Sequence, residues 1–154
     1  MAKPKPASEP DDLYERDFYA WTQDQAAKLR ARAHNAIDWD NAAEEIESLG
    51  SSQKREIRNR LRVLLAHLLK WQYQASRRKV GWRQTIREQR RQIESVLDDS
   101  PSLKALPGEI LAEVYDKAIE DAVDETRLPS SVFPAACPWT IDEIIDTAFL
   151  PGDA

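Results

Sequence analysis

The sequence is poor in the residue types on which several protein classes depend. It holds one cysteine, Cys137, which excludes an internal disulfide framework. Its four glycines form no phosphate-cradling loop. Its two histidines, His34 and His67, lack a second ligand at HxH or HxxxH spacing. We therefore expect no metal site and no cofactor.

Long apolar runs are also missing. The longest, residues 63–69, is interrupted by His67 and is far too short to span a bilayer. The start, MAKPKPASEPDD, lacks the apolar stretch of a signal peptide. We expect a cytoplasmic protein that does not enter membranes. The 154 residues are 42% hydrophobic and 32% charged, a composition typical of a helix-rich globular protein.

Apolar residues recur at spacings of three and four along most of the chain, and no segment alternates with a period of two. We expect a flexible leader over residues 1–10 and a single helical domain over 11–154. The expected helices cover residues 12–33, 39–49, 52–74, 82–97 and 110–123, with a short turn after Pro101 and a short terminal helix after the capping box Thr140–Glu143. Asp38 is expected to cap the helix 39–49 and Gly50 to end it, because glycine enters the left-handed conformation cheaply. This helix is expected to bury Trp39, Ala42, Ala43, Ile46 and Leu49. The predicted fold is all-α, an irregular bundle of four principal helices with short helices and a Pro-rich crossing segment, RLPSSVFPAACPW.

Several blocks of the sequence are familiar together and in this order. They are LYERDFYAW (13–21), AIDWDNAAEEIESLG (36–50), LLAHLLKWQYQ (64–74), GWRQTI (81–86), SPSL (100–103), ET (125–126) and FPAACPW (133–139). Over about residues 12–150 the chain resembles the bacterial family called domain of unknown function 29. The resemblance implies a helical protein of the kind found mainly in cyanobacteria and proteobacteria. It implies no activity and supplies no catalytic or binding residues.

Charge is distributed very unevenly. Residues 54–91 contain 13 basic residues against two acidic ones, a net charge of +11, while the whole chain carries −5 and the remainder therefore −16. Acidic helices packed beside this basic hairpin would neutralise it through surface ion pairs. Alternatively, part of the hairpin stays open and binds nucleic-acid phosphates. The overall pI near 5.1 favours neutralisation.

The bend between the two basic helices holds the candidate binding residues. If the protein binds a polyanion, Arg77, Arg78, Lys79 and Arg83 are expected to contact it. Two nearby tryptophans fall at core spacing, so we interpret Trp71 and Trp82 as structural packing residues rather than base-stacking ones. Tyr73 is the ring expected to be exposed.

Catalytic candidates are few. Glu45 and Glu47 flank the apolar stripe of the helix 39–49, and His67 lies at the edge of the apolar face of the next helix. A carboxylate meeting a histidine suits general acid and base chemistry. The favoured interpretation is structural, with His67 bonded to a glutamate of the short helix. Cys137 is expected to be a small buried apolar residue.

These observations predict a non-enzymatic helical module that binds a partner. The expected partner is another protein or a second copy of the chain. Two alternatives stay open: nucleic-acid binding through residues 54–91, and a small hydrolase using Glu45, Glu47 and His67.

Overall fold

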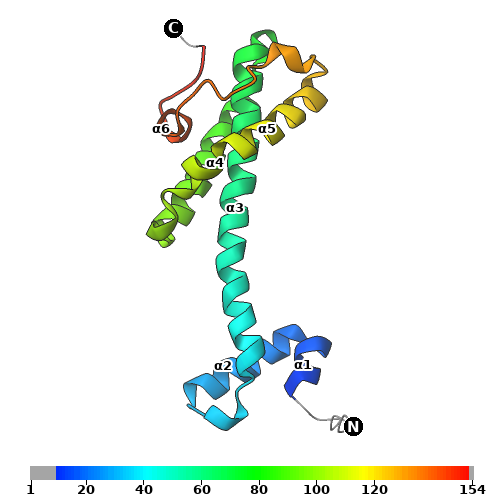
Figure 1. Ribbon diagram of the computed structural model, residues 1–154, viewed down its shortest axis with the longest axis vertical. Helices are drawn as coiled ribbons and strands as arrows, with labels where there is room; N and C mark the ends of the chain where they lie inside the picture. The colour runs from blue at the N-terminus through cyan, green and yellow to red at the C-terminus, as the bar shows by residue number, and fades with distance from the viewer. Residues whose placement is uncertain (1–9, 153–154) are drawn as a thin grey trace. The chain divides into compact units, whose positions relative to one another are not determined.

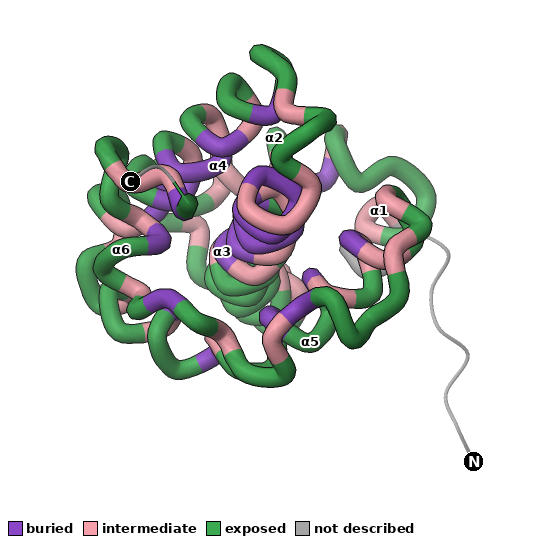
Figure 2. Tube along the Cα trace, turned by 90° about the horizontal axis from the view of Figure 1, so that it is seen from above, coloured by how far each residue is buried: buried purple, intermediate pink, exposed green. Residues whose placement is uncertain are grey.

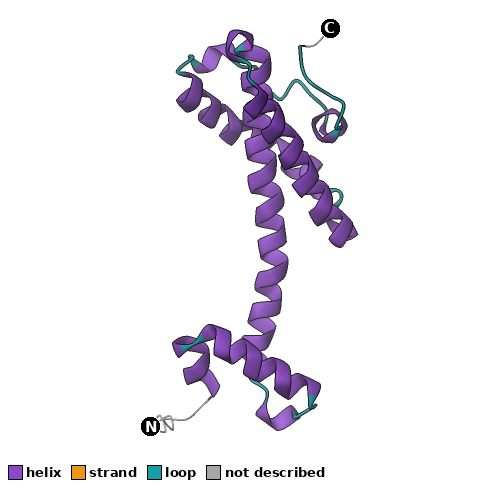
Figure 3. Ribbon diagram, turned by 180° about the vertical axis from the view of Figure 1, so that it is seen from behind, coloured by secondary structure: helices purple, strands orange, loops and turns teal. Residues whose placement is uncertain are grey.

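The computed structural model describes residues 10–152, and the described part of the chain is helical without any strand (Figures 1 and 3). Its α-helices are α1 (Pro10–Arg16), α2 (Phe18–Arg30), α3 (Trp39–Tyr73), α4 (Val80–Asp99), α5 (Leu106–Thr126) and α6 (Ile141–Ile145). The predicted all-α class is confirmed. The predicted leader lies outside the described residues except for Pro10, the first residue of α1.

Contacts along the chain define two compact units, residues 1–51 and 52–154. The first contains α1, α2 and the beginning of α3, and the second contains the rest of the described helices. The expectation of a single domain stays a prediction, and each unit is described by itself below.

In the first unit, the helix expected over residues 12–33 is two helices. The backbone at Asp17 is not helical (φ −148°, ψ 87°), and its carboxylate accepts a hydrogen bond from the amide of Ala20 at 3.0 Å. An aspartate that can satisfy a free amide at a helix start favours such a cap over the helix interior. The apolar spacing continues across the break, and for this reason periodicity alone missed it.

Among residues 13–51, the described side chains of the first unit, those of Trp21, Gln25 and Ile37 are buried. Asp38 ties two of them to the start of α3. The indole Nε1 of Trp21 donates to Oδ2 of Asp38 at 3.1 Å, and the amide of Asp38 donates to Oε1 of Gln25 at 2.8 Å. Oδ1 of Asp38 also accepts from the amide of Asn41 at 3.5 Å, as expected for a helix cap.

The expectation that Gly50 ends a helix is wrong. α3 continues through Gly50, which has no positive φ, and a Cβ at this position would meet nothing within 4 Å. A glycine costs a helix roughly 1 kcal/mol relative to alanine, which is too little to end one where the following residues favour continuation. The predicted burial of the first part of α3 is wrong as well, because Trp39, Ile46 and Leu49 are 53%, 68% and 68% exposed.

The second unit contains the apolar core. Buried positions of α3 begin at Ile57, and from Leu64 to Trp71 every residue except His67 is buried, so this part of the helix is covered on all sides. Figure 2 shows buried positions on α3 and on the helices around it. The buried residues of α3 join buried residues of α4, α5, the crossing segment and α6 in one cluster, which includes Leu61, Leu64, Leu68, Ile86, Ile93, Val114, Ala118, Phe133 and Ile144. The phenol of Tyr115 donates to the carbonyl of Pro134 at 2.6 Å and so holds the crossing segment against α5.

Of three local predictions in the second unit, two are confirmed and one is wrong. The capping box at Thr140 and Glu143 is present and starts α6. Pro101 opens a short 3₁₀ turn, as expected. Tyr73, however, is not an exposed ring. It packs edge-on against Phe133 with ring centroids 5.7 Å apart.

Candidate functional site

The first unit presents an exposed apolar face on α3. Trp39, Ile46 and Leu49 are separated by seven and three residues, so they lie on one side of the helix. Each is more than half exposed. Glu45 and Glu47 flank them, which gives the apolar face an acidic border.

Glu45 and His67 have hydrogen-bond partners other than the expected ones. Glu45 accepts a hydrogen bond from the phenol of Tyr14, which raises the pKa of Tyr14 to about 12, and Glu47 is exposed. The expected pairing assumed two helices separated at Gly50, whereas residues 39–73 form one helix.

His67 is instead bonded within its own part of α3. Its Nδ1 donates to the carbonyl of Val63 at 2.9 Å, and its Nε2 lies 3.4 Å from Nζ of Lys70. Burial is the largest cause of a lowered pKa, so the ring is neutral at pH 7. With both nitrogens engaged, the ring is poorly placed to move a substrate proton.

Lys70 is a buried cation that sequence reasoning missed. Its Nζ donates to Oε2 of Glu125 at 2.5 Å and lies 5.0 Å from the ring centroid of Trp82. The side chain is 8% exposed. The available signal was its position between Leu69 and Trp71, on a helix whose neighbouring positions are apolar. These contacts satisfy the ammonium and indicate a structural role.

Acidic residues of α5 pair with the basic part of α3. Nη1 of Arg58 lies 2.5 Å from Oε1 of Glu113. Arg62 forms a bidentate ion pair with Asp121, with its Nε and Nη2 donating to the two carboxylate oxygens at 2.6 and 2.7 Å. The Lys70–Glu125 pair is a third link of the same kind. Residues 92–154 contain 14 acidic and three basic residues. Their net charge of −11 is equal in magnitude to the net charge of +11 on residues 54–91. This balance supports neutralisation within the second unit.

The four predicted binding residues have different surroundings. Arg78 is half-buried, donates from Nε to the carbonyl of Trp71 at 2.7 Å, and covers the Trp71 ring at 4.8 Å. Lys79 lies 5.7 Å from the ring centroid of Trp82. Arg77 and Arg83 are exposed.

The two tryptophans beneath these cations belong to the core cluster. Trp71 and Trp82 are each 8% exposed. Cations lie over both rings, as described above, so a stacking base would have to displace them.

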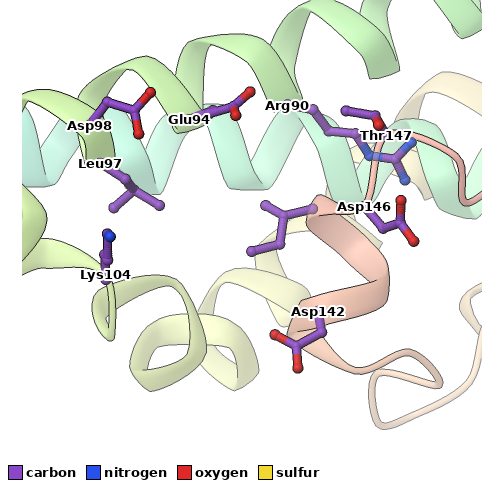
Figure 4. A pocket seen from close by; sticks show the side chains of 9 residues that line it. Arg90, Glu94, Leu97, Asp98, Lys104, Asp142, Asp146 and Thr147 are labelled. Carbon is purple, nitrogen blue, oxygen red and sulfur yellow. The ribbon is translucent and has the colours of Figure 1, made fainter.

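Two neighbouring grooves lie between α4 and residues 142–150. The larger, of about 530 Å³, is lined by Arg90, Glu94, Leu97, Asp98, Lys104, Asp142, Ile145, Asp146 and Thr147 (Figure 4). Its four carboxylates outnumber its two cations. The smaller, of about 310 Å³, is lined by Arg83, Ile86, Arg87, Arg90, Thr147, Ala148 and Leu150 and has no acidic residue in its wall.

Arg90 borders both grooves and is 3% exposed. Its Nε donates to the carbonyl of Ile144 at 2.7 Å, whereas its Nη2 is buried without a hydrogen-bond partner among the described residues. Burial lowers its pKa, and the nearby Asp146 opposes this effect. The sequence signal, an arginine in register with Ile86 and Ile93 on the apolar face of α4, was missed.

Cys137 is half-buried, and its thiol lies 3.4 Å from the carbonyl of Trp139. Burial is the largest cause of its raised pKa, so the thiol is protonated at neutral pH. A protonated thiol is a poor nucleophile. Within residues 10–152, no group of three or more His, Cys, Asp or Glu side chains is placed to hold a metal ion. No helix in the same part of the chain has the length and apolar character to cross a membrane.

The fold and these sites define an all-α protein with an exposed apolar face on its first unit and balanced charge within its second. The chain belongs to the family described as Domain of unknown function DUF29, whose family model matches residues 13–150. No curated protein and no solved structure matches it.

Proposed function

We propose that the protein is a non-enzymatic binding module whose first unit docks a partner protein on the exposed face of α3. The observation that carries this proposal is the exposure of Trp39, Ile46 and Leu49 on one side of a helix. Burying three such side chains in an interface is favourable by several kcal/mol at roughly 25 cal/mol per Å². Aromatic and large aliphatic residues are also frequent anchors of interfaces.

The charge around this face selects the kind of partner. Residues 1–51 contain 11 acidic and six basic residues, and Glu45 and Glu47 border the apolar side chains. A second copy would bring equal negative charge to the same border, which is unfavourable. A helix with an apolar stripe and basic flanks is complementary, so a protein partner presenting such a helix is the proposed occupant.

The hydrolase alternative has less support. His67 engages Val63 and Lys70, and Glu45 engages Tyr14, so no histidine and carboxylate form a pair at these positions. Nucleic-acid binding through residues 54–91 is also less supported, because three cations of α3 are paired with α5.

The test places a photo-crosslinking amino acid at position 46 in the native host and identifies what it captures. The purified captured protein is then titrated against wild type, the double variant Ile46→Glu/Leu49→Glu, and the control Ser48→Glu. Ser48 is exposed on the opposite side of α3, so Ser48→Glu adds charge without touching the apolar face. We expect the double variant to lose binding by at least about a hundredfold and the control to retain it.

Two results would contradict the proposal. Capture of only a second copy, together with a wild-type dimer that the double variant dissociates in sedimentation equilibrium, would make the occupant a second copy. Equal loss of binding in the double variant and Ser48→Glu would show that the apolar face is not the docking surface. Circular dichroism of each variant verifies that α3 is still folded.

A further inference from the structure

Arg90 carries a buried charge that the described protein groups leave largely uncompensated. Its guanidinium makes one hydrogen bond, to a neutral carbonyl, and forms no ion pair with any described residue. Asp146 contributes only a longer-range attraction. A buried guanidinium without a close counter-ion is costly, and such groups are normally paired.

The smaller groove beside Arg90 adds two more cations. Arg83 and Arg87 precede Arg90 on α4 by seven and three residues, so all three lie toward one side of the helix and line the groove. Both are exposed, and neither forms an ion pair with a described residue. Like charges gathered in this way repel one another, so their arrangement favours an anion between them.

The groove also has the size and mixed lining of a small-molecule site. Its volume of about 310 Å³ is at the lower end of the range for ligand pockets. The hydroxyl of Thr147 offers a further hydrogen-bond donor, and Ile86, Ala148 and Leu150 offer an apolar wall.

We infer that this groove binds a phosphate monoester of a small molecule through Arg83, Arg87 and Arg90. Three guanidinium charges, reduced by the nearby Asp146, match a dianion better than a monoanion. Guanidinium groups bind phosphate oxygens through paired, charge-assisted hydrogen bonds. The apolar wall is placed to contact the organic group of the ester. This site lies in the second unit and is independent of the proposed docking face on the first.

Phenyl phosphate, inorganic phosphate and benzoate are the probes, titrated into the full chain by calorimetry. We expect phenyl phosphate to bind tightest, because it has both the dianion and an apolar group. Inorganic phosphate should bind more weakly and benzoate more weakly still. Binding of phenyl phosphate should strengthen as pH rises through its second ionisation near pH 6. A preference for inorganic phosphate over phenyl phosphate would identify free phosphate as the ligand and overturn the ester.

Variants of the exposed arginines locate the site without disturbing the core. Arg83→Gln and Arg87→Gln should each weaken phenyl phosphate binding by about tenfold to a hundredfold, the effect of losing one charge-assisted hydrogen bond. Arg77→Gln removes the same charge from an exposed position outside the groove and should change affinity less than about twofold.

Either of two outcomes would overturn the inference. One is the absence of heat of binding, and of any change in the arginine Nε–H resonances, at millimolar phenyl phosphate. The other is equal weakening by Arg77→Gln and Arg83→Gln, which would indicate a diffuse attraction to positive charge instead of a groove.

Discussion

At the scale of single residues, neighbouring cations of one bend have different roles. Arg78 donates to the carbonyl of Trp71 and lies over its ring, whereas Arg77, one residue earlier, is exposed. Replacing Arg78 by glutamine removes a charge-assisted hydrogen bond and a cation–π contact, so we expect a loss of about 1–3 kcal/mol in the free energy of unfolding. Arg77→Gln should change it by less than about 0.5 kcal/mol. Urea unfolding of both variants measures the difference, and equal stabilities would contradict the structural role of Arg78.

A second residue-scale prediction concerns pH. The pKa of His67 is lowered from 6.5, mainly by burial, so the unfolded chain binds a proton more readily than the folded one. Its contribution to stability is therefore fully present above about pH 6.5 and is lost as pH falls toward the folded-state pKa. Lys70 and Lys79 act with burial, while Val63 and Glu125 act against it.

The measurement compares wild type with His67→Gln. Carboxylates elsewhere also titrate at low pH, so the informative quantity is the difference in free energy of unfolding between the two proteins. We expect the stability advantage of the wild type, whatever its size at pH 7.5, to shrink as pH is lowered below 6.5. A difference that stays constant or grows over that interval would show that the His67 pKa is not depressed in the folded state.

At the scale of elements, a substitution at Gly50 tests whether residues 39–73 form one helix, as in the structure, or two helices, as the sequence predicted. If glycine ended a helix there in the left-handed conformation, Gly50→Ala would be destabilising. Since Gly50 lies inside α3 with open space at its Cβ position, we expect Gly50→Ala to stabilise the protein by about 0.5–1 kcal/mol.

Hydrogen exchange of the amides around position 50 is the most direct measurement for this variant. The expected result is slower exchange in Gly50→Ala than in wild type over residues 47–54. Gly81 supplies a matched comparison, because it lies in the first turn of α4, also with open space at its Cβ. Gly81→Ala should leave exchange around position 50 unchanged.

How well each element could be predicted depended on whether its signal was local. Both hydrogen bonds of the capping box at Thr140 join residues three positions apart, and it was predicted correctly. The break at Asp17 and the continuation of α3 through Gly50 were predicted wrongly. A helix cap and a glycine inside a helix each change the stability of the helix by only about 1 kcal/mol, and the spacing of apolar residues does not reveal such small effects.

The candidate sites show the same limit. Residue type and spacing located the basic hairpin, but they could not identify which cations are paired, because Arg62 and Asp121 are 59 positions apart. Arg90 was missed for a related reason. A buried charge on an apolar face is visible in the sequence, whereas the groove beside it depends on how residues 147–150 pack against α4.

At the scale of the whole molecule, charge is balanced within the second unit and not within the first. Residues 52–154 contain 16 acidic and 16 basic residues, whereas residues 1–51 carry a net charge of −5. The basic hairpin thus has its counter-charge in the same unit, much of it on α5. We expect wild-type binding to a 20-base-pair duplex to be no tighter than the non-specific range of about 10⁻⁴–10⁻⁶ M at physiological salt.

Removing the counter-charge gives the sharper test of this balance. The double variant Glu113→Gln/Asp121→Asn frees Arg58 and Arg62 from their partners on α5. If neutralisation by α5 is what suppresses nucleic-acid binding, this variant should bind the duplex more tightly than wild type. The slope of log K against log salt should steepen by up to roughly 0.9 for each new phosphate contact. The double variant Glu109→Gln/Asp124→Asn removes two carboxylates of α5 that form no ion pair with a described residue, so it controls for the change in net charge. A wild type that already binds tightly, with a steep salt slope that Arg77→Gln/Lys79→Gln flattens, would instead favour the nucleic-acid alternative over the protein-binding module.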